Sequence, residues 1–257
     1  MAFVPDYRAY APRTAADGAV IDAGLRGYML RVYNWMTSGL LLTGIVAYGI
    51  ANTDLINLFY HQVQTARGVG YAPTMLGYLA IFAPLAFVMV LSFGIKRLSR
   101  QTTQGLFWLF AAAMGASMAN IFLIYAGDSI ARVFFITAGT FGAMSVWGYT
   151  TRTDLSRFGS FLIMGLIGIV IASLVNMFVG STAMQFAISV VGVLVFVGLT
   201  AYDTQRIKND YVQHAYAEGT DGAAVRSVYD ALSLYLNFIN LFMLLLQLFG
   251  TGRNSNS

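Results

Sequence analysis

The stretch GVLVFVGLTAYDTQRIK, residues 192–208, decides the class of protein to which this chain belongs. An apolar run leads directly into Asp203, and the chain then turns basic at Arg206 and Lys208. A continuous run of this kind is typical of a membrane-spanning helix, in which a carboxylate is costly. The stretch therefore raises the question of what the Asp203 side chain faces.

The composition agrees with a membrane protein. Of 257 residues, 58% are hydrophobic and only 10% are charged, whereas soluble domains carry about 25% charged residues. The chain has no Cys, and its two His residues, His61 and His214, fall in polar connections. We therefore expect no thiolate catalysis, no zinc, haem or iron–sulfur site, and no bound cofactor. The positive charge is spread over short connections rather than gathered in a patch, which argues against nucleic-acid binding.

Seven segments are long and apolar enough to span a bilayer as helices, which takes about 20 residues each. Continuous apolar runs without alternation favour helices over barrel strands. The sequence therefore predicts an all-α membrane protein with seven transmembrane helices in a domain over 28–250. A disordered cytoplasmic tail is expected over 1–27, a short polar tail over 251–257, and mobile connections at 52–75 and 204–229. The predicted spans are 30–51, 76–95, 104–125, 132–150, 158–179, 184–203 and 230–249.

The basic residues predict the orientation of these spans. Twelve Lys and Arg residues fall in the N-terminal tail and the even-numbered connections, and three fall on the other side. Because basic residues concentrate in cytoplasmic loops, the N-terminus is expected in the cytoplasm and the C-terminus outside.

The sequence allows two interpretations of Asp203. It is either a helix-end residue paired with Arg206, three residues later on the same helix face, or part of an interior face. Thr200, Phe196 and Ser189 precede it on that face and suit a bundle interior better than lipid.

The seventh predicted span carries a mostly polar stripe at alternating spacings of three and four residues. Such a stripe must face protein or water within a membrane. It therefore either joins helices by hydrogen bonds or lines an ion path. Asn120 and Asn176, in the third and fifth spans, are expected to join helices. The stripe consists of Asp230, Ser233, Asn237, Asn240, Leu244 and Gln247.

Motifs of enzymes are absent from the sequence. There is no G-x-S-x-G, no H-E-x-x-H and no Gly-rich phosphate loop. A membrane aspartyl protease needs two carboxylates that share a proton, and no second Asp or Glu lies within a span except near the ends. The chain is therefore not expected to be an enzyme.

Several long segments, in order, resemble the Bax inhibitor-1 (TMBIM) family of seven-helix membrane proteins. They are similar above all to its bacterial inner-membrane branch, from about residue 24 to 250. The segments are GLRGYMLRVYNWMTSGLLLTG, TAGTFGAMSVWGYTTRTDLSRFG, GLIGIVIASLVNMF, GLTAYDTQRIK and ALSLYLNFINLFMLLLQLFG.

The resemblance implies a pH-sensitive cation leak that passes Ca²⁺, with a central seventh helix ringed by the other six. It also implies a proton-sharing aspartate pair near the cytoplasmic side, and Asp203 matches its sixth-helix member. The family's LYLDFIN reads LYLNFIN here, so the second member is Asn237, which cannot titrate. A basic group at the inner end of the second helix corresponds to Lys96 or Arg97.

The sequence and the resemblance together predict a Ca²⁺-permeable leak channel in a bacterial inner membrane. Asp203 is the expected charged gate residue, with Asn237 as its hydrogen-bond partner and Arg206 in support. Because Ca²⁺ prefers oxygen ligands, Asp203, Asn237, Asn240 and Thr200 are candidate ligands. The alternative is a regulator without transport activity, which binds other membrane proteins such as a quality-control protease. In both cases the lipid bilayer is the surrounding partner.

Overall fold

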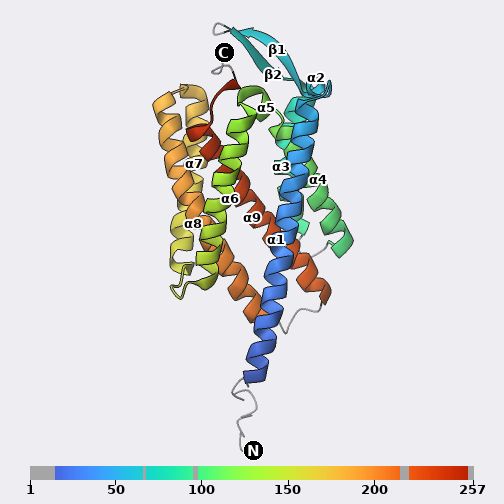
Figure 1. Cartoon of the computed structure of the whole chain (residues 1–257), viewed down its shortest axis with the longest axis vertical. Helices are drawn as coiled ribbons and strands as arrows, with labels where there is room; N and C mark the ends of the chain where they lie inside the picture. Colours follow the sequence, from blue (N-terminus) through green and yellow to red (C-terminus); the bar gives the residue numbers. More distant parts are fainter. Residues whose placement is uncertain (1–14, 66–67, 95–97, 215–219, 254–257) are drawn as a thin grey trace, which may run out of the picture.

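The chain forms an elongated bundle of long helices, seen in a computed structural model that describes residues 15–65, 68–94, 98–214 and 220–253 (Figure 1). The long helices are α1 (Ala15–Ala51), α3 (Met75–Gly94), α4 (Arg100–Met118), α6 (Gly127–Thr150), α7 (Ser156–Val179), α8 (Thr182–His214) and α9 (Thr220–Phe249). Two single-turn helices, α2 (Ile56–Phe59) and α5 (Ile121–Ile124), join them on one end of the bundle.

The predicted all-α membrane architecture is confirmed. Five segments are long and apolar enough to cross a bilayer: Arg100–Ile124 and the spans within α6, α7, α8 and α9. A shorter apolar helix covers Met75–Val90 in α3. The described residues of six predicted spans each lie on one long helix, and 104–125 covers α4, the break at residues 119–120 and α5. Because α1 and α3 are not among the five segments, the count of seven spans stays a prediction.

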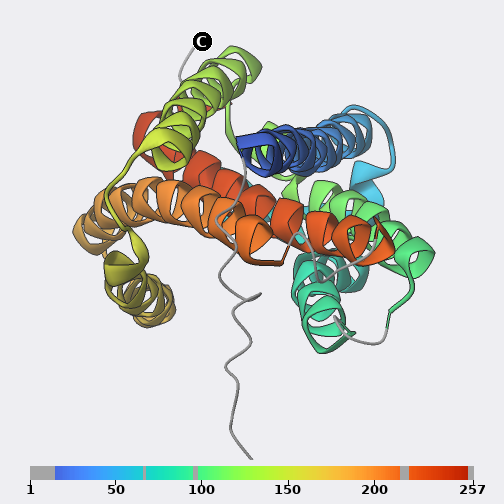
Figure 2. The same cartoon turned by 90° about the horizontal axis from the view of Figure 1, so that it is seen from below.

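Helix α9 lies at the centre of the bundle. It packs chiefly against α1, α4, α6 and α8, while α3 packs on α4 and α7 on α8. Figure 2, seen along the bundle, shows α9 crossing the middle with α3 and α7 at the periphery. More than half of its apolar stretch is buried, the largest share of any candidate span. The ring of six helices implied by the resemblance is therefore uneven, with four helices in close contact and two outside them.

Three helices extend beyond their predicted limits. Helix α8 continues eleven residues past Asp203 to His214, and α9 begins at Thr220, so the described part of 204–229 is helical. Helix α1 begins at Ala15, within the expected tail of 1–27. Apolarity marks only the part of a helix inside the bilayer, which is why these polar extensions were predicted as loops and tail.

The connection at 52–75, expected to be mobile, contains α2 and a two-stranded hairpin. Strand β1 (Tyr60–Thr65) pairs antiparallel with β2 (Gly68–Pro73), with Tyr60 opposite Pro73. The start of the C-terminal tail is also held in place at this end of the molecule. The Thr251 N–H donates to Ser129 Oγ at 2.9 Å, and Arg253 Nη1 donates to the Phe122 carbonyl at 3.1 Å.

Small residues allow the helix backbones to approach closely. A side chain at Gly148 of α6 would collide with the backbone of Ala201 on α8, and one at Gly115 of α4 with the carbonyl of Thr43 on α1. Close backbone approach at small residues is a main source of helix association in membranes. The tight α6–α8 contact holds fixed the segment of α8 that carries Asp203.

A buried ionic site between α8 and α9

Asp203 lies in the middle of α8, not at its end. Eleven residues, or about 16 Å of helix, separate it from His214. Only 8% of the residue is exposed, and it faces α9. The interior-face interpretation of Asp203 is therefore correct, and the pairing with Arg206 is present as well.

Both carboxylate oxygens of Asp203 are occupied by donors. Arg206 places Nε and Nη2 each 3.0 Å from Oδ1. On the other oxygen, Ser233 Oγ donates at 3.0 Å and Asn237 Nδ2 at 2.7 Å. Arg206 Nη2 also donates to Ser233 Oγ at 3.3 Å, which closes a ring of hydrogen bonds between α8 and α9.

Every contact of Asp203 is that of an acceptor, as expected for an ionised carboxylate. The orientation of the Asn237 amide follows from the network, because its oxygen in that place would face a carboxylate oxygen. Hydrogen bonds to a charged acceptor are about twice as strong as neutral ones. The site thus holds one charge pair, satisfied by side chains from two helices.

A second carboxylate lies on α9, two turns before Asn237. Asp230 is buried, and its Oδ2 accepts a hydrogen bond from the Tyr28 hydroxyl of α1 at 2.6 Å. Arg206 interacts electrostatically with Asp230 and Asp210 as well as with Asp203. The charged centre therefore extends along α9 and links α1, α8 and α9.

The structure brings only some of the predicted residues together. Asp203, Asn237 and Arg206 meet, as described. Thr200 is buried on the same helix, but its hydroxyl donates to the Phe196 carbonyl one turn earlier. Asn240 is exposed and donates to the Leu236 carbonyl, so it does not join the site. Lys96 and Arg97 lie outside the described residues.

The polar stripe of α9 is thus interior only in part, and helix geometry explains why. Successive residues of an α-helix are about 100° apart, so Asp230 lies within about 20° of Asn237, whereas Asn240 lies about 60° around the helix from it. Asp230 and Asn237 stay on the buried face, whereas Asn240 and Gln247 turn out of it. The prediction that Asn240 faces the interior is therefore wrong.

Polar residues join helices at the opposite end of the bundle. Gln247 Oε1 accepts from Gln185 Nε2 and from Ser189 Oγ, both at 2.9 Å. Asn176 of α7 donates to Gln185 Oε1 at 3.2 Å, as expected for a residue that joins helices. Asn120 lies at the break between α4 and α5 and makes no side-chain cap there.

Tyr28 belongs to the site but was not among the predicted residues. It lies 202 positions from Asp230, and no local pattern connects them. In the sequence, Tyr28 looks like an ordinary aromatic residue of the core. Its hydroxyl, on an otherwise apolar face of α1, was the one sign that it needs a polar partner.

Within the described residues, no three or more Asp, Glu, His or Cys side chains gather as a metal site. The four candidate Ca²⁺ ligands do not converge either, since Thr200 and Asn240 point elsewhere. Arg206, Ser233 and Asn237 donate to both carboxylate oxygens of Asp203, so in this arrangement neither oxygen is free to bind a cation.

A bundle of apolar helices around a central helix with a buried ionic site defines a polytopic helical membrane protein. The family model described as "Inhibitor of apoptosis-promoting Bax1" matches residues 25–254, and the chain belongs to this Bax inhibitor-1 family. The "Inner membrane protein YbhL" of Escherichia coli K12 is 48% identical over 233 residues, covering 90% of this chain and 94% of that protein. An "Uncharacterized protein" of Caulobacter vibrioides is 44% identical over 250 residues, covering 96% of this chain and 98% of that protein. The "Uncharacterized protein RP147" of Rickettsia prowazekii is 43% identical over 242 residues, covering 94% and 96%.

Proposed function

We propose that this protein is a cation leak channel of a bacterial inner membrane, permeable to Ca²⁺ and controlled at Asp203. The observation that carries the proposal is a charge-paired carboxylate buried between α8 and α9 at the centre of an apolar bundle. Intramembrane ionisable residues that face a bundle interior typically mark ion pathways. The similarity to an inner membrane protein of E. coli supports the location.

In the proposed mechanism, the described arrangement is the closed state. The Arg206 guanidinium occupies the position beside Asp203 that a passing cation would take. Opening requires Arg206 to leave the carboxylate and α8 to separate from Ser233 and Asn237. The carboxylate then attracts a cation, while water and backbone carbonyls supply the remaining oxygen ligands.

Two substitutions should change the flux in opposite directions. Asp203→Asn removes the cation-attracting charge and leaves Arg206 facing the path, so Ca²⁺ entry into proteoliposomes should fall by about tenfold, which corresponds to about 1.4 kcal/mol. Arg206→Gln frees the carboxylate and should raise the flux severalfold. Fluorescent Ca²⁺ indicator trapped in the vesicles measures both.

Asp128→Asn is the matched control, because Asp128 pairs with Arg132 at the surface with 65% of its side chain exposed. It should leave flux unchanged. If the unaltered protein passes no more Ca²⁺ than empty vesicles do, the channel proposal is wrong and the regulator alternative is favoured. Equal flux in all three variants would instead place the path away from Asp203.

The orientation is a further part of the proposal. With the N-terminus in the cytoplasm, alkaline phosphatase fused after Ser257 should be active, and green fluorescent protein fused there should be dark. The reverse result would contradict the predicted topology and would place the end of α8 outside the cell.

A further inference from the structure

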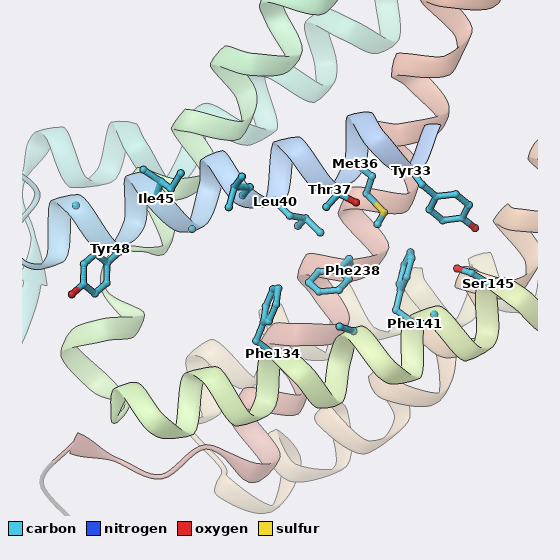
Figure 3. Close-up of a pocket in the computed structure, with 15 residues that line it drawn as sticks. Tyr33, Met36, Thr37, Leu40, Ile45, Tyr48, Phe134, Phe141, Ser145 and Phe238 are labelled. Carbon is cyan, nitrogen blue, oxygen red and sulfur yellow. The ribbon is translucent and has the colours of Figure 1, made fainter. Parts of the chain in front are cut away.

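An apolar groove runs between α1 and α6 with α9 as its floor. Both helices pack on α9 but scarcely on each other. The groove has a volume of about 800 Å³. In Figure 3, Tyr33, Met36 and Leu40 of α1 face Phe134 and Phe141 of α6 across it, with Phe238 of α9 between them.

The groove opens toward the surrounding bilayer. On α1, the side chains at its outer rim are exposed, Leu41 by 65% and Ile45 by 60%. From Tyr33 to Gly49 it follows about 24 Å of helix, longer than one leaflet of hydrocarbon, about half of a 30 Å core. Its dimensions therefore suit an extended hydrocarbon chain.

The charged side chain lies at one end of the groove. There the groove continues into a cavity of about 440 Å³ that is lined by Arg26, Tyr33, Ser145 and Tyr149 among others, with no carboxylate. This end is therefore complementary to a negative charge.

Ser145 supplies an independent sign of a missing ligand. It is 95% buried, as only 5% is exposed, and lines both cavities. Among the buried side chains that the structure describes, its Oγ is the polar atom without a hydrogen-bond partner. Neighbouring hydroxyls, such as Thr137 and Thr150 on the same helix, instead donate to the carbonyl one turn earlier.

We infer that this groove binds one anionic phospholipid, which comes from the inner leaflet on the orientation proposed above. The phosphate lies at Arg26, a glycerol ester oxygen accepts from Ser145 Oγ, and the acyl chain follows Met36 and Phe141. Ser145 lies one helical turn, about 6 Å, before Tyr149 at the basic end, so an ester oxygen below the phosphate can reach it. The arrangement gives a buried hydroxyl the acceptor that it lacks and covers apolar side chains at the same time.

The test measures lipid bound to the purified full chain by native mass spectrometry, with phosphatidylglycerol and phosphatidylcholine of identical chains. We expect one phosphatidylglycerol per protein, retained about fivefold better than phosphatidylcholine, the effect of one basic residue near an anionic headgroup. Arg26→Gln should remove that preference. Glycerol phosphate without acyl chains should not bind, whereas binding as tight as that of the lipid would assign a phosphate site and overturn the proposal.

A matched pair of substitutions locates the lipid. Gly142 lines the groove, Gly139 does not, and a Cβ at either position meets open space. Gly142→Leu should therefore fill the groove and abolish retention of both lipids, while Gly139→Leu should leave it intact. Equal retention in the two variants would overturn the proposal. So would a dimer in the unaltered protein that Gly142→Leu dissociates, since the groove would then hold a second copy.

Ser145→Ala tests the ester contact separately. It should weaken lipid retention severalfold without lowering the unfolding midpoint of the lipid-free protein, because no bond within the described residues is lost. Unchanged retention would overturn the assignment of Ser145 as a lipid contact.

Discussion

Replacing Asn237 by aspartate is expected to give the channel a steep pH dependence between about pH 6 and 8, where a coupled carboxylate pair titrates. With Asn237 as it stands, the amide donates to Asp203 Oδ2 at 2.7 Å and carries no proton that titrates in this range. We therefore expect flux through the unaltered protein to depend only weakly on pH in this range.

In Asn237→Asp, two carboxylates would stand at hydrogen-bond distance and share one proton at low pH. Loss of that proton leaves two negative charges, of which Arg206 neutralises one. Two unit charges 4 Å apart interact by about 4 kcal/mol at an effective dielectric constant of 20. Flux should accordingly rise by at least about tenfold as the pH increases and repulsion separates α8 from α9. The pH dependence of the flux is measured as Ca²⁺ entry into vesicles that have the same pH on both sides.

Asn240→Asp is the control for this prediction, since it adds a carboxylate one turn further along α9 on the exposed side. It should leave the pH profile flat. Adding Asp203→Asn to Asn237→Asp should also restore a flat profile. A steep response in the unaltered protein, unaffected by Asn237→Asp, would show that the titrating group lies elsewhere.

Leu241→Ala is expected to be among the most destabilising single changes in the bundle. The side chain is fully buried on α9, and truncation of a buried Leu to Ala typically costs 2–5 kcal/mol because it leaves a cavity. Asn240→Leu, at the adjacent position, should change stability by no more than about 0.5 kcal/mol, as exposed substitutions usually do. The unfolding midpoint in a dodecyl sulfate titration of the micelle-solubilised protein compares them.

Leu194→Ala is the matched control, because Leu194 of α8 is 68% exposed. The same substitution at this exposed position should have little effect on the unfolding midpoint. If Asn240→Leu unfolds the protein and Leu241→Ala does not, α9 must be rotated relative to the structure described here.

Much of the fold could be predicted because it depends on local properties of the chain. Apolar runs set the positions of α3, α6 and α7 to within a few residues. The extensions of α8 and α9 could not be found this way, since polar helices outside the bilayer lack the signal that marks a span. The hairpin at 60–73 was also missed, because its two strands carry little apolar alternation.

The site was predictable to the extent that it follows helix periodicity. The three-residue spacing of Asp203 and Arg206 predicted their ion pair. The position of Asn237 on the polar stripe predicted its contact with Asp203, and the structure contains both contacts. Asn240 was misplaced because the three-residue step from Asn237 turns it about 60° around α9, to the exposed edge of the stripe. The hydrogen bond between Tyr28 and Asp230 depends on the approach of α1 to α9, which is a property of the assembled bundle.

The central position of the last helix has a consequence for biosynthesis. Helix α9 leaves the ribosome after the others, so Asp203 enters the membrane before Ser233 and Asn237 can reach it. Of its donors, Arg206 alone is present then, because it belongs to α8 itself. An ion pair within a single helix lowers the penalty of inserting a carboxylate. Because the Asp203–Arg206 pair carries no net charge, the newly inserted α8 can remain in the bilayer until α9 completes the bundle.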